Sequence, residues 1–180
     1  SLGQTALWHF TDIPPDAQAY DRDRDCPKPP EVIGGIRPLD IRDCIVDRIL
    51  DSEQRLADSK LDRADRAIAL KFLVHFVGDL HQPFHAIGPD GGNSTLVVAF
   101  GSPMCPRPEG TTVMCSLHEI WDRTLLDRRG LTDRQYADAL LKQIRAQQLE
   151  AVAQASPGQW ATDSFLLAKA AMPANGTIDE

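Results

Sequence analysis

The run H-F-V-G-D-L-H-Q-P-F-H, from His75 to His85, most constrains what this chain can fold into. It sets metal-capable side chains in a strongly apolar stretch. His75 and Asp79 are four residues apart, so a helix would present both on one face, one turn apart. Pro83 lacks an amide donor and disfavours helix just before it. We therefore expect the helix to end near residues 80–82 and the chain to bring His85 back toward the same place.

A second pair with this spacing lies in S-L-H-E-I-W-D, and W-H-F-T-D near the start adds another histidine, so four of the five histidines lie in such contexts. Neutral imidazole and carboxylate are usual zinc ligands, and polar groups in apolar segments are unfavourable unless satisfied. We predict a metal site formed by His9, His75, Asp79, His85, His118 and Asp122. For His75 and Asp79 alone, a hydrogen-bonded pair in the core is an equal alternative.

Length and composition suit one well-packed domain spanning residues 1–180, with 42% hydrophobic residues. The net charge of −7 argues against a broad basic face, although bound cations would add local positive charge. No apolar run reaches the roughly 18 residues of a membrane span. The cysteines form two close pairs, Cys26 with Cys44 and Cys105 with Cys115. Such pairs suit disulfides and a secreted or periplasmic protein, and four reduced cysteines are the alternative.

Apolar spacing close to the helical repeat predicts helices over about 39–57, 60–81, 132–154 and 157–171. Ser59 with Asp62 resembles a capping box that opens the second of these helices. Its expected buried stripe is Leu61, Ala64, Ile68, Phe72 and His75. Residues 95–100 form the one convincing strand, and 111–114 could pair with it as a small β-hairpin. The D-R-D-R-D run at 21–25 is most simply a solvated surface. The expected fold class is mainly α.

The motifs resemble those of the zinc-dependent single-strand-specific nucleases, or 3′-nucleotidases, known as the S-one/P-one nuclease family. The resemblance rests on W-H-F-T-D, H-F-V-G-D-L-H-Q-P-F-H, G-G-N and S-L-H-E-I-W-D, in the family's order and over most of the chain. It implies a helical phospholipase C/nuclease-like fold and a cluster of three zinc ions. His9, His75 and Asp79 match ligands of the first zinc, and Asp79 would also bridge to the third. The matches to ligands of the second are His85, His118 and Asp122.

The resemblance also implies a zinc-dependent endonuclease that hydrolyses single-stranded DNA and RNA, and 3′-nucleotides, to 5′-phosphate products by a metal-activated hydroxide. Asp79 is then the candidate catalytic residue. Phe10 matches a ring on which the family stacks a nucleobase, and Asp12 a carboxylate that reads the base edge. Asn93 closes the G-G-N motif, which lies near the site in the family. Core packing is the alternative for Phe10, and turn formation for Asn93.

The chain departs from the family pattern at its ends. Family members begin the mature chain with a Trp that binds the third zinc, followed by a His and an Asp ligand, whereas this chain starts at Ser1-Leu2 and has none of the three. The family's last helix is also missing from the sequence, so we expect a domain truncated at both ends. We expect it to be a monomer. Two alternatives remain. One is a phospholipase C-like hydrolase with the same metal cluster, and the other is a catalytically incomplete helical fragment in which zinc is only structural.

Overall fold

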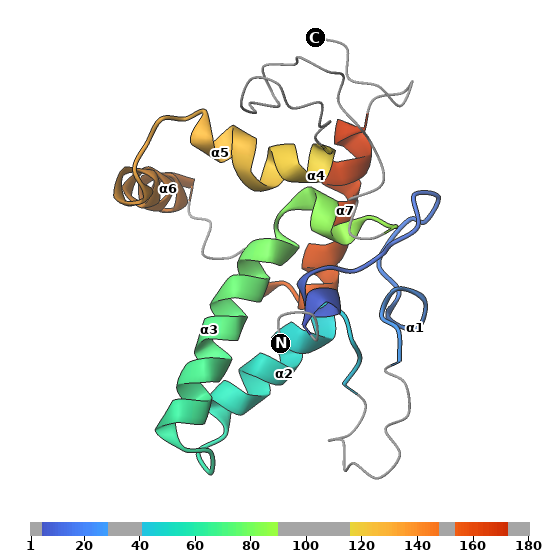
Figure 1. The fold of residues 1–180 in the computed structure, drawn as a ribbon, viewed down its shortest axis with the longest axis vertical. Helices are drawn as coiled ribbons and strands as arrows, with labels where there is room; N and C mark the ends of the chain where they lie inside the picture. Colours follow the sequence, from blue (N-terminus) through green and yellow to red (C-terminus); the bar gives the residue numbers. More distant parts are fainter. Residues whose placement is uncertain (1–4, 29–40, 90–115, 148–153, 173–180) are drawn as a thin grey trace, which may run out of the picture.

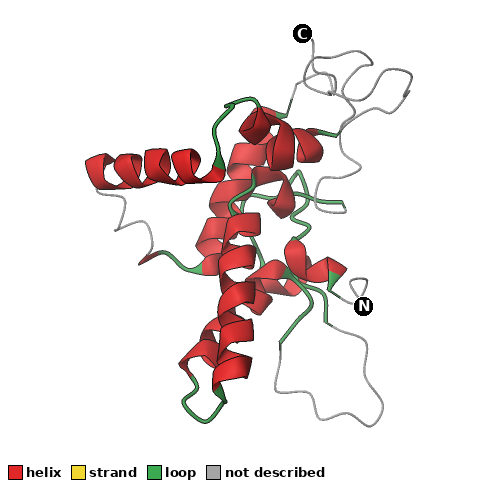
Figure 2. Ribbon diagram, turned by 60° about the vertical axis from the view of Figure 1, so that its left-hand side comes forward, coloured by secondary structure: helices red, strands yellow, loops and turns green. Residues whose placement is uncertain are grey.

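The computed structural model describes residues 5–28, 41–89, 116–147 and 154–172. These ranges are mainly α-helical (Figure 2), which confirms the expected fold class. Ile13 and Ile87 form an isolated parallel β-bridge. The predicted hairpin lies outside the described residues, as do Asn93, Cys105 and Cys115. None of the described helices combines the length and the hydropathy needed to cross a bilayer.

Two helices form a hairpin along one half of the molecule. α2 (Ile45–Ala57) and α3 (Arg63–Leu80) pack side by side in the lower part of Figure 1. Fully burying one large apolar side chain stabilises a fold by roughly 1.5–3 kcal/mol, so this contact is a main source of stability. The buried apolar residues of the two helices are Ile45, Val46, Ile49, Ala69, Phe76 and Leu80.

The start and the buried face of α3 differ from the expectation. Asp62, rather than Ser59, is the N-cap, because its side chain accepts a hydrogen bond of 2.8 Å from the main-chain N–H of Asp65. A carboxylate there satisfies a donor without an intrahelical partner and interacts favourably with the helix dipole. The predicted stripe is also wrong, since Ile68 is 46% exposed and the neighbouring Ala69 is buried. The position of α2 decides which side of α3 is covered.

The end of α3 agrees with the prediction from Pro83. The last residue of the helix is Leu80, and Gln82 takes an extended conformation. A single 3-10 turn, η3 (Pro83–Ala86), follows, and all of its residues are buried. The turn redirects the chain and carries His85 into the core.

α7 (Pro157–Ala171) packs against η3 and α2. Ser156 caps it by accepting a hydrogen bond from the N–H of Gln159, and proline occupies the first helical position. The buried hydroxyl of Ser164 donates a hydrogen bond of 2.6 Å to the main-chain oxygen of Leu80. Because main-chain oxygens at a helix C-terminus lack intrahelical partners, this bond ties the end of α3 to α7.

α6 (Asp133–Gln147) projects away from the other described helices, as Figure 2 shows on the left. Thr132 and Gln135 form a capping box at its start. The Gln135 side-chain oxygen accepts from the N–H of Thr132 at 2.9 Å, and the Thr132 hydroxyl accepts from the N–H of Gln135 at 3.3 Å. α6 has no buried residue among those that the structure describes, so its formation relies mainly on capping and helix propensity.

The predicted disulfide between Cys26 and Cys44 is present, with 18 residues of sequence separation. Closing a loop of that length stabilises the fold by about 3 kcal/mol in the chain-entropy account. Both cysteines are buried, and Cys44 immediately precedes α2. The bond therefore holds the N-terminal segment against the hairpin.

The D-R-D-R-D run is only partly the solvated surface that the sequence suggests: Asp21, Asp23 and Arg24 are exposed, whereas Asp25 is buried. It contains a short helix, α1 (Arg22–Asp25), in which Asp25 is 2% exposed and pairs with Arg24. Arg22 donates two hydrogen bonds, of 2.9 and 2.7 Å, to the buried carboxylate of Asp47 on α2. Because the disulfide holds the run close to α2, the carboxylates of Asp25 and Asp47 lose water and have to be paired.

Candidate metal centre

The first group of ligand-type side chains lies where η2 (Ala6–His9) crosses α3. Nδ1 of His9 is 2.9 Å from Oδ2 of Asp79. Nε2 of His75 lies 3.1 Å from Nδ1 of His9 and 3.2 Å from Oδ2 of Asp79. His75 and Asp79 lie one turn apart, as predicted, and the His9 ring packs edge-on against Phe76. The side chain of His75 is 56% exposed, so the alternative of a core pair is wrong for this residue.

The second group consists of His85, His118 and Asp122. His85 comes from η3, and the other two from a continuous helical segment made of α4 (Leu117–Glu119), η5 (Ile120–Thr124) and α5 (Leu125–Asp127). The two Nε2 atoms each lie 3.2 Å from an oxygen of Asp122. The two imidazole rings stack with their centroids 4.5 Å apart. Asp122 lies in a π-helical turn, a local widening that often occurs at functional sites.

The backbone of His9 determines the tautomer of His85. Nδ1 of His85 is 2.7 Å from the main-chain oxygen of His9, and a carbonyl oxygen can only accept. Nδ1 therefore carries the proton, and in the neutral ring Nε2 keeps its lone pair. That lone pair faces a carboxylate oxygen of Asp122 at 3.2 Å. Two acceptors this close require a proton or a metal cation between them.

The donor sets of both groups fit a divalent cation. In each group the three ligand atoms lie within 4.8 Å of one another. Zinc at about 2.0–2.1 Å from tetrahedral ligands keeps those ligands about 3.3 Å apart, close to the separations in both groups. Cys26, Cys44 and Asp47 also lie within this range, but their sulfurs form the disulfide and are not thiolate ligands.

The pKa of Asp122 is held well below its ordinary range. Partial burial alone would raise this pKa, but hydrogen bonds with His118, His85 and Gln82 outweigh burial. The carboxylate therefore stays ionised over the range in which neutral histidines can bind a metal.

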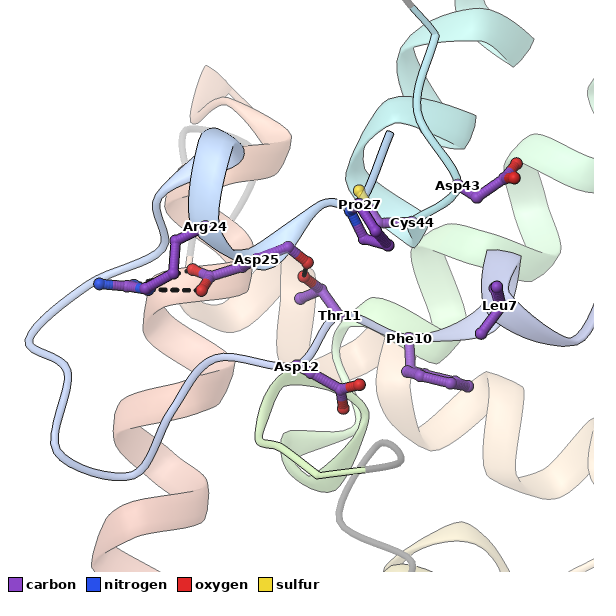
Figure 3. Close-up of a pocket in the computed structure, with 9 residues that line it drawn as sticks. All are labelled: Leu7, Phe10, Thr11, Asp12, Arg24, Asp25, Pro27, Asp43 and Cys44. Atoms are coloured by element: carbon purple, nitrogen blue, oxygen red, sulfur yellow. Dashed lines mark hydrogen bonds and ion pairs between the residues drawn. The ribbon is translucent and has the colours of Figure 1, made fainter. Parts of the chain in front are cut away.

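A pocket of about 200 Å³ lies beside the segment that follows His9 (Figure 3). The segment is extended, so successive side chains point to opposite sides. The hydroxyl of Thr11 donates a hydrogen bond of 2.8 Å to the main-chain oxygen of Asp25. The side chains of Phe10 and Asp12 point away from Asp25 (Figure 3). The pocket is lined by Leu7, Phe10, Thr11, Asp12, Arg24, Asp25, Pro27, Asp43 and Cys44.

Comparison with known proteins identifies the family. The sequence profile of the family described as S1/P1 Nuclease matches residues 2–179. The chain belongs to the S1/P1 nuclease family. It is 29% identical to Nuclease P1 of Penicillium citrinum over 150 residues, which cover 79% of this chain and 47% of that protein. It is 27% identical to Nuclease S1 of Aspergillus oryzae over 146 residues, or 77% of this chain and 42% of that protein.

A plant relative shows the same partial coverage. The chain is 28% identical to Endonuclease 3 of Arabidopsis thaliana over 125 residues, which cover 68% of this chain and 36% of that protein. The match to each of these curated relatives thus spans less than half of the relative's length.

For this member of the S1/P1 nuclease family, all six predicted ligands fall into the two groups, and their roles as ligands stay predictions. The fifth histidine, His81, lies in neither group: its Nδ1 is 2.7 Å from the main-chain oxygen of Val77, and its ring packs against Trp160. Sequence reasoning missed Gln82 and Ser164, whose hydrogen bonds hold the segments that carry the predicted ligands. Gln82 lies inside the H-Q-P-F-H motif, so the motif marks its position without revealing its contact.

Proposed function

We propose that this chain is the zinc-binding part of a nuclease that hydrolyses single-stranded DNA and RNA, and 3′-nucleotides, leaving 5′-phosphates. The observation that carries the proposal is the convergence of six side chains, from three motifs far apart in the sequence, into two histidine-and-aspartate groups. Membership of the S1/P1 nuclease family and the names of the curated relatives support a nuclease, and so a nucleic-acid substrate.

Each group has a defined role in this proposal. His9, His75 and Asp79 hold one zinc, and His85, His118 and Asp122 hold another. Bound zinc would supply Lewis acidity toward the phosphate and lower the pKa of water toward about 7. The residues of the chain fix where that chemistry occurs. Asp79 is the proposed catalytic carboxylate, because one of its oxygens lies 2.9 Å from a histidine of a distant segment and 3.2 Å from a histidine of its own helix.

Phe10 and Asp12 are the proposed substrate contacts. Both line the pocket beside the segment that follows His9, so a base stacked on the Phe10 ring would have its edge near the Asp12 carboxylate. Stacking accepts any base but needs it unstacked from a duplex, which accounts for a preference for single strands. The aromatic-and-carboxylate pair favours a nucleobase over a lipid headgroup.

We further propose that the protein acts outside the reducing cytosol, in a secreted or periplasmic setting. The Cys26–Cys44 disulfide supports this, because such bonds persist in oxidising compartments.

Hydrolysis by the full chain tests the function. Heat-denatured DNA, duplex DNA, 3′-AMP and phosphatidylcholine are assayed side by side, with products separated by chromatography. We expect 5′-mononucleotides from denatured DNA, loss of activity with a chelator, recovery with Zn²⁺, and no activity in Asp79→Ala. Asp163→Ala, which changes an exposed aspartate of α7, is the matched control and should stay active.

Three results would contradict the proposal. Activity that survives both the chelator and Asp79→Ala would exclude a metal mechanism at this site. Release of phosphocholine in place of nucleotides would favour the phospholipase alternative. One tightly held zinc with no hydrolysis of any substrate would favour a structural role for the metal.

A further inference from the structure

Gln82 makes a contact that the proposed function does not use. Its side-chain nitrogen donates a hydrogen bond of 3.0 Å to Oδ1 of Asp122, forty residues further along the chain. Its side-chain oxygen accepts a hydrogen bond of 2.6 Å from the main-chain N–H of Phe84. One amide thus touches both the start of the turn that carries His85 and a carboxylate on the opposite helical segment.

The two contacts determine the orientation of this amide. The N–H of Phe84 can only donate, so the oxygen of Gln82 has to face it, and an ionised carboxylate can only accept, so the nitrogen has to face Asp122. A flipped amide would lose both bonds and would set oxygen against oxygen. Oδ1 of Asp122 has two acceptor directions, so it accepts from Gln82 and still faces Nε2 of His85, 3.2 Å away.

The main chain of Gln82 also lies between the two groups. Its N–H donates to the main-chain oxygen of Asp79 at 3.0 Å, and its main-chain oxygen accepts from the N–H of His85 at 3.0 Å. Every hydrogen-bonding part of this residue is therefore directed at, or immediately beside, a predicted ligand. A glutamine needed only to cap a 3-10 turn would not require a nitrogen aimed at a ligand carboxylate.

We propose that Gln82 is a positioning residue of the second metal group, which fixes the Asp122 carboxylate so that it faces His85 and His118. The inference rests on the metal centre of the proposed function. The Asp122 side chain is 43% exposed, so water would otherwise compete for its oxygens and allow it to rotate. Partners that orient a metal ligand in this way commonly change metal affinity by about 10- to 100-fold when removed.

Zinc affinity of the second group, measured by chelator competition, tests the proposal. All variants are made in the full chain carrying His75→Ala, so that the first group is disabled. Gln82→Ser keeps an oxygen that caps the turn but is too short to reach Asp122, whereas Gln82→Met loses both contacts. Gln159→Ser is the matched control, because the Gln159 side chain donates to Asp163 at 2.9 Å on the exposed side of α7.

We expect Gln82→Ser to weaken zinc binding by about 10- to 100-fold, while its metal-free melting temperature stays that of the parent. Gln159→Ser should leave the affinity unchanged. The absorption spectrum of bound Co²⁺ should also change in Gln82→Ser, because a ligand carboxylate is reoriented. If Gln82→Ser does not fold, Gln82→Asn, which withdraws the amide by one methylene group, is measured in its place.

Two results would overturn the inference. Equal zinc affinity in the parent and Gln82→Ser, with a loss only in Gln82→Met, would show that Gln82 acts solely as a cap. Equal losses in Gln82→Ser and Gln159→Ser would show a general effect. Failure of the His75→Ala parent to bind zinc would refute the second metal group, and this inference with it. Failure of the unsubstituted chain as well would refute the metal centre of the proposed function, so the two kinds of failure are distinguishable.

Discussion

His85 is oriented by the backbone of His9: Nδ1 of the imidazole lies 2.7 Å from the main-chain oxygen, across 76 residues of sequence. The side chain of His9 belongs to the first group, and its main-chain oxygen accepts a hydrogen bond from His85 of the second group. The main-chain N–H of Thr11 in turn donates to the main-chain oxygen of His85 at 2.8 Å. The two groups are therefore held relative to each other by the same short segment.

Removal of the carboxylate of the second group should remove one zinc. We expect Asp122→Ala to hold about one zinc fewer per chain than the parent after dialysis, because neutral imidazoles alone bind the cation less well. Mass spectrometry of the eluted metal measures this. Asp127→Ala, an exposed aspartate of the same helical segment, should retain the parental content. Unchanged zinc in Asp122→Ala would contradict a site at the second group.

The ring of Phe10 should matter for substrate and not for metal. Stacking of one base is worth about 1–3 kcal/mol, so Phe10→Ala should lower kcat/KM on denatured DNA by roughly 5- to 150-fold. Phe10→Tyr keeps the ring and should remain close to the parent. Zinc content should be unchanged in both variants. Full activity of Phe10→Ala would favour a packing role for this ring.

Ser164→Ala should destabilise the fold through the end of α3. It leaves the buried main-chain oxygen of Leu80 without this donor, which costs about 1–3 kcal/mol in the free energy of unfolding. Ser52→Ala is the matched control, since this buried hydroxyl bonds only an oxygen within its own helix, that of Arg48. Urea denaturation of the metal-free proteins measures both. An equal loss of unfolding free energy in the two variants would contradict this explanation.

Tyr20 should make the fold sensitive to alkaline pH. Burial, with the charge of Asp47, raises the pKa of the Tyr20 hydroxyl above its ordinary value. The stabilisation from the buried, protonated Tyr20 hydroxyl is complete below about pH 10, where the hydroxyl is protonated in both the folded and the unfolded chain. As the pH rises further, the unfolded chain loses its proton first, so stability falls.

Replacing this hydroxyl tests the pH dependence. Tyr20→Phe should therefore show a smaller fall in urea midpoint than the parent between about pH 9 and 11. Tyr136→Phe, on the projecting helix α6, controls for the loss of a tyrosine and should follow the parent. Parallel curves for Tyr20→Phe and the parent would refute the assignment.

Features that depend on near neighbours could be predicted from the sequence. The turn after α3 follows from Pro83, whose missing N–H ends a helix wherever it occurs. The caps at Thr132 and Ser156 were predictable because a hydroxyl satisfies a donor only three residues away. The pairing of His75 with Asp79 follows from the helical repeat alone. The close cysteine pair likewise pointed to the Cys26–Cys44 bond.

Features that depend on burial could not be predicted in this way. The exposure of Ile68 and the burial of Ala69 depend on where α2 lies, which the apolar period of α3 does not specify. The sequence suggests that Asp25 is a surface charge, but it is buried because the disulfide holds its segment against α2. Gln82 could not be assigned a role because its partner, Asp122, is remote in the chain.

The sequence by itself determined the identity and local spacing of the ligand-type residues, since helical periodicity and proline geometry act over a few residues. Only the tertiary structure decided that His9 reaches α3, that His85 presents Nε2 rather than Nδ1, and that the six side chains form two groups. The physical reason is that these relationships depend on the packing of remote segments and on hydrogen bonds to main-chain atoms. Every residue has a main-chain carbonyl, so the sequence does not indicate which one will accept a given hydrogen bond.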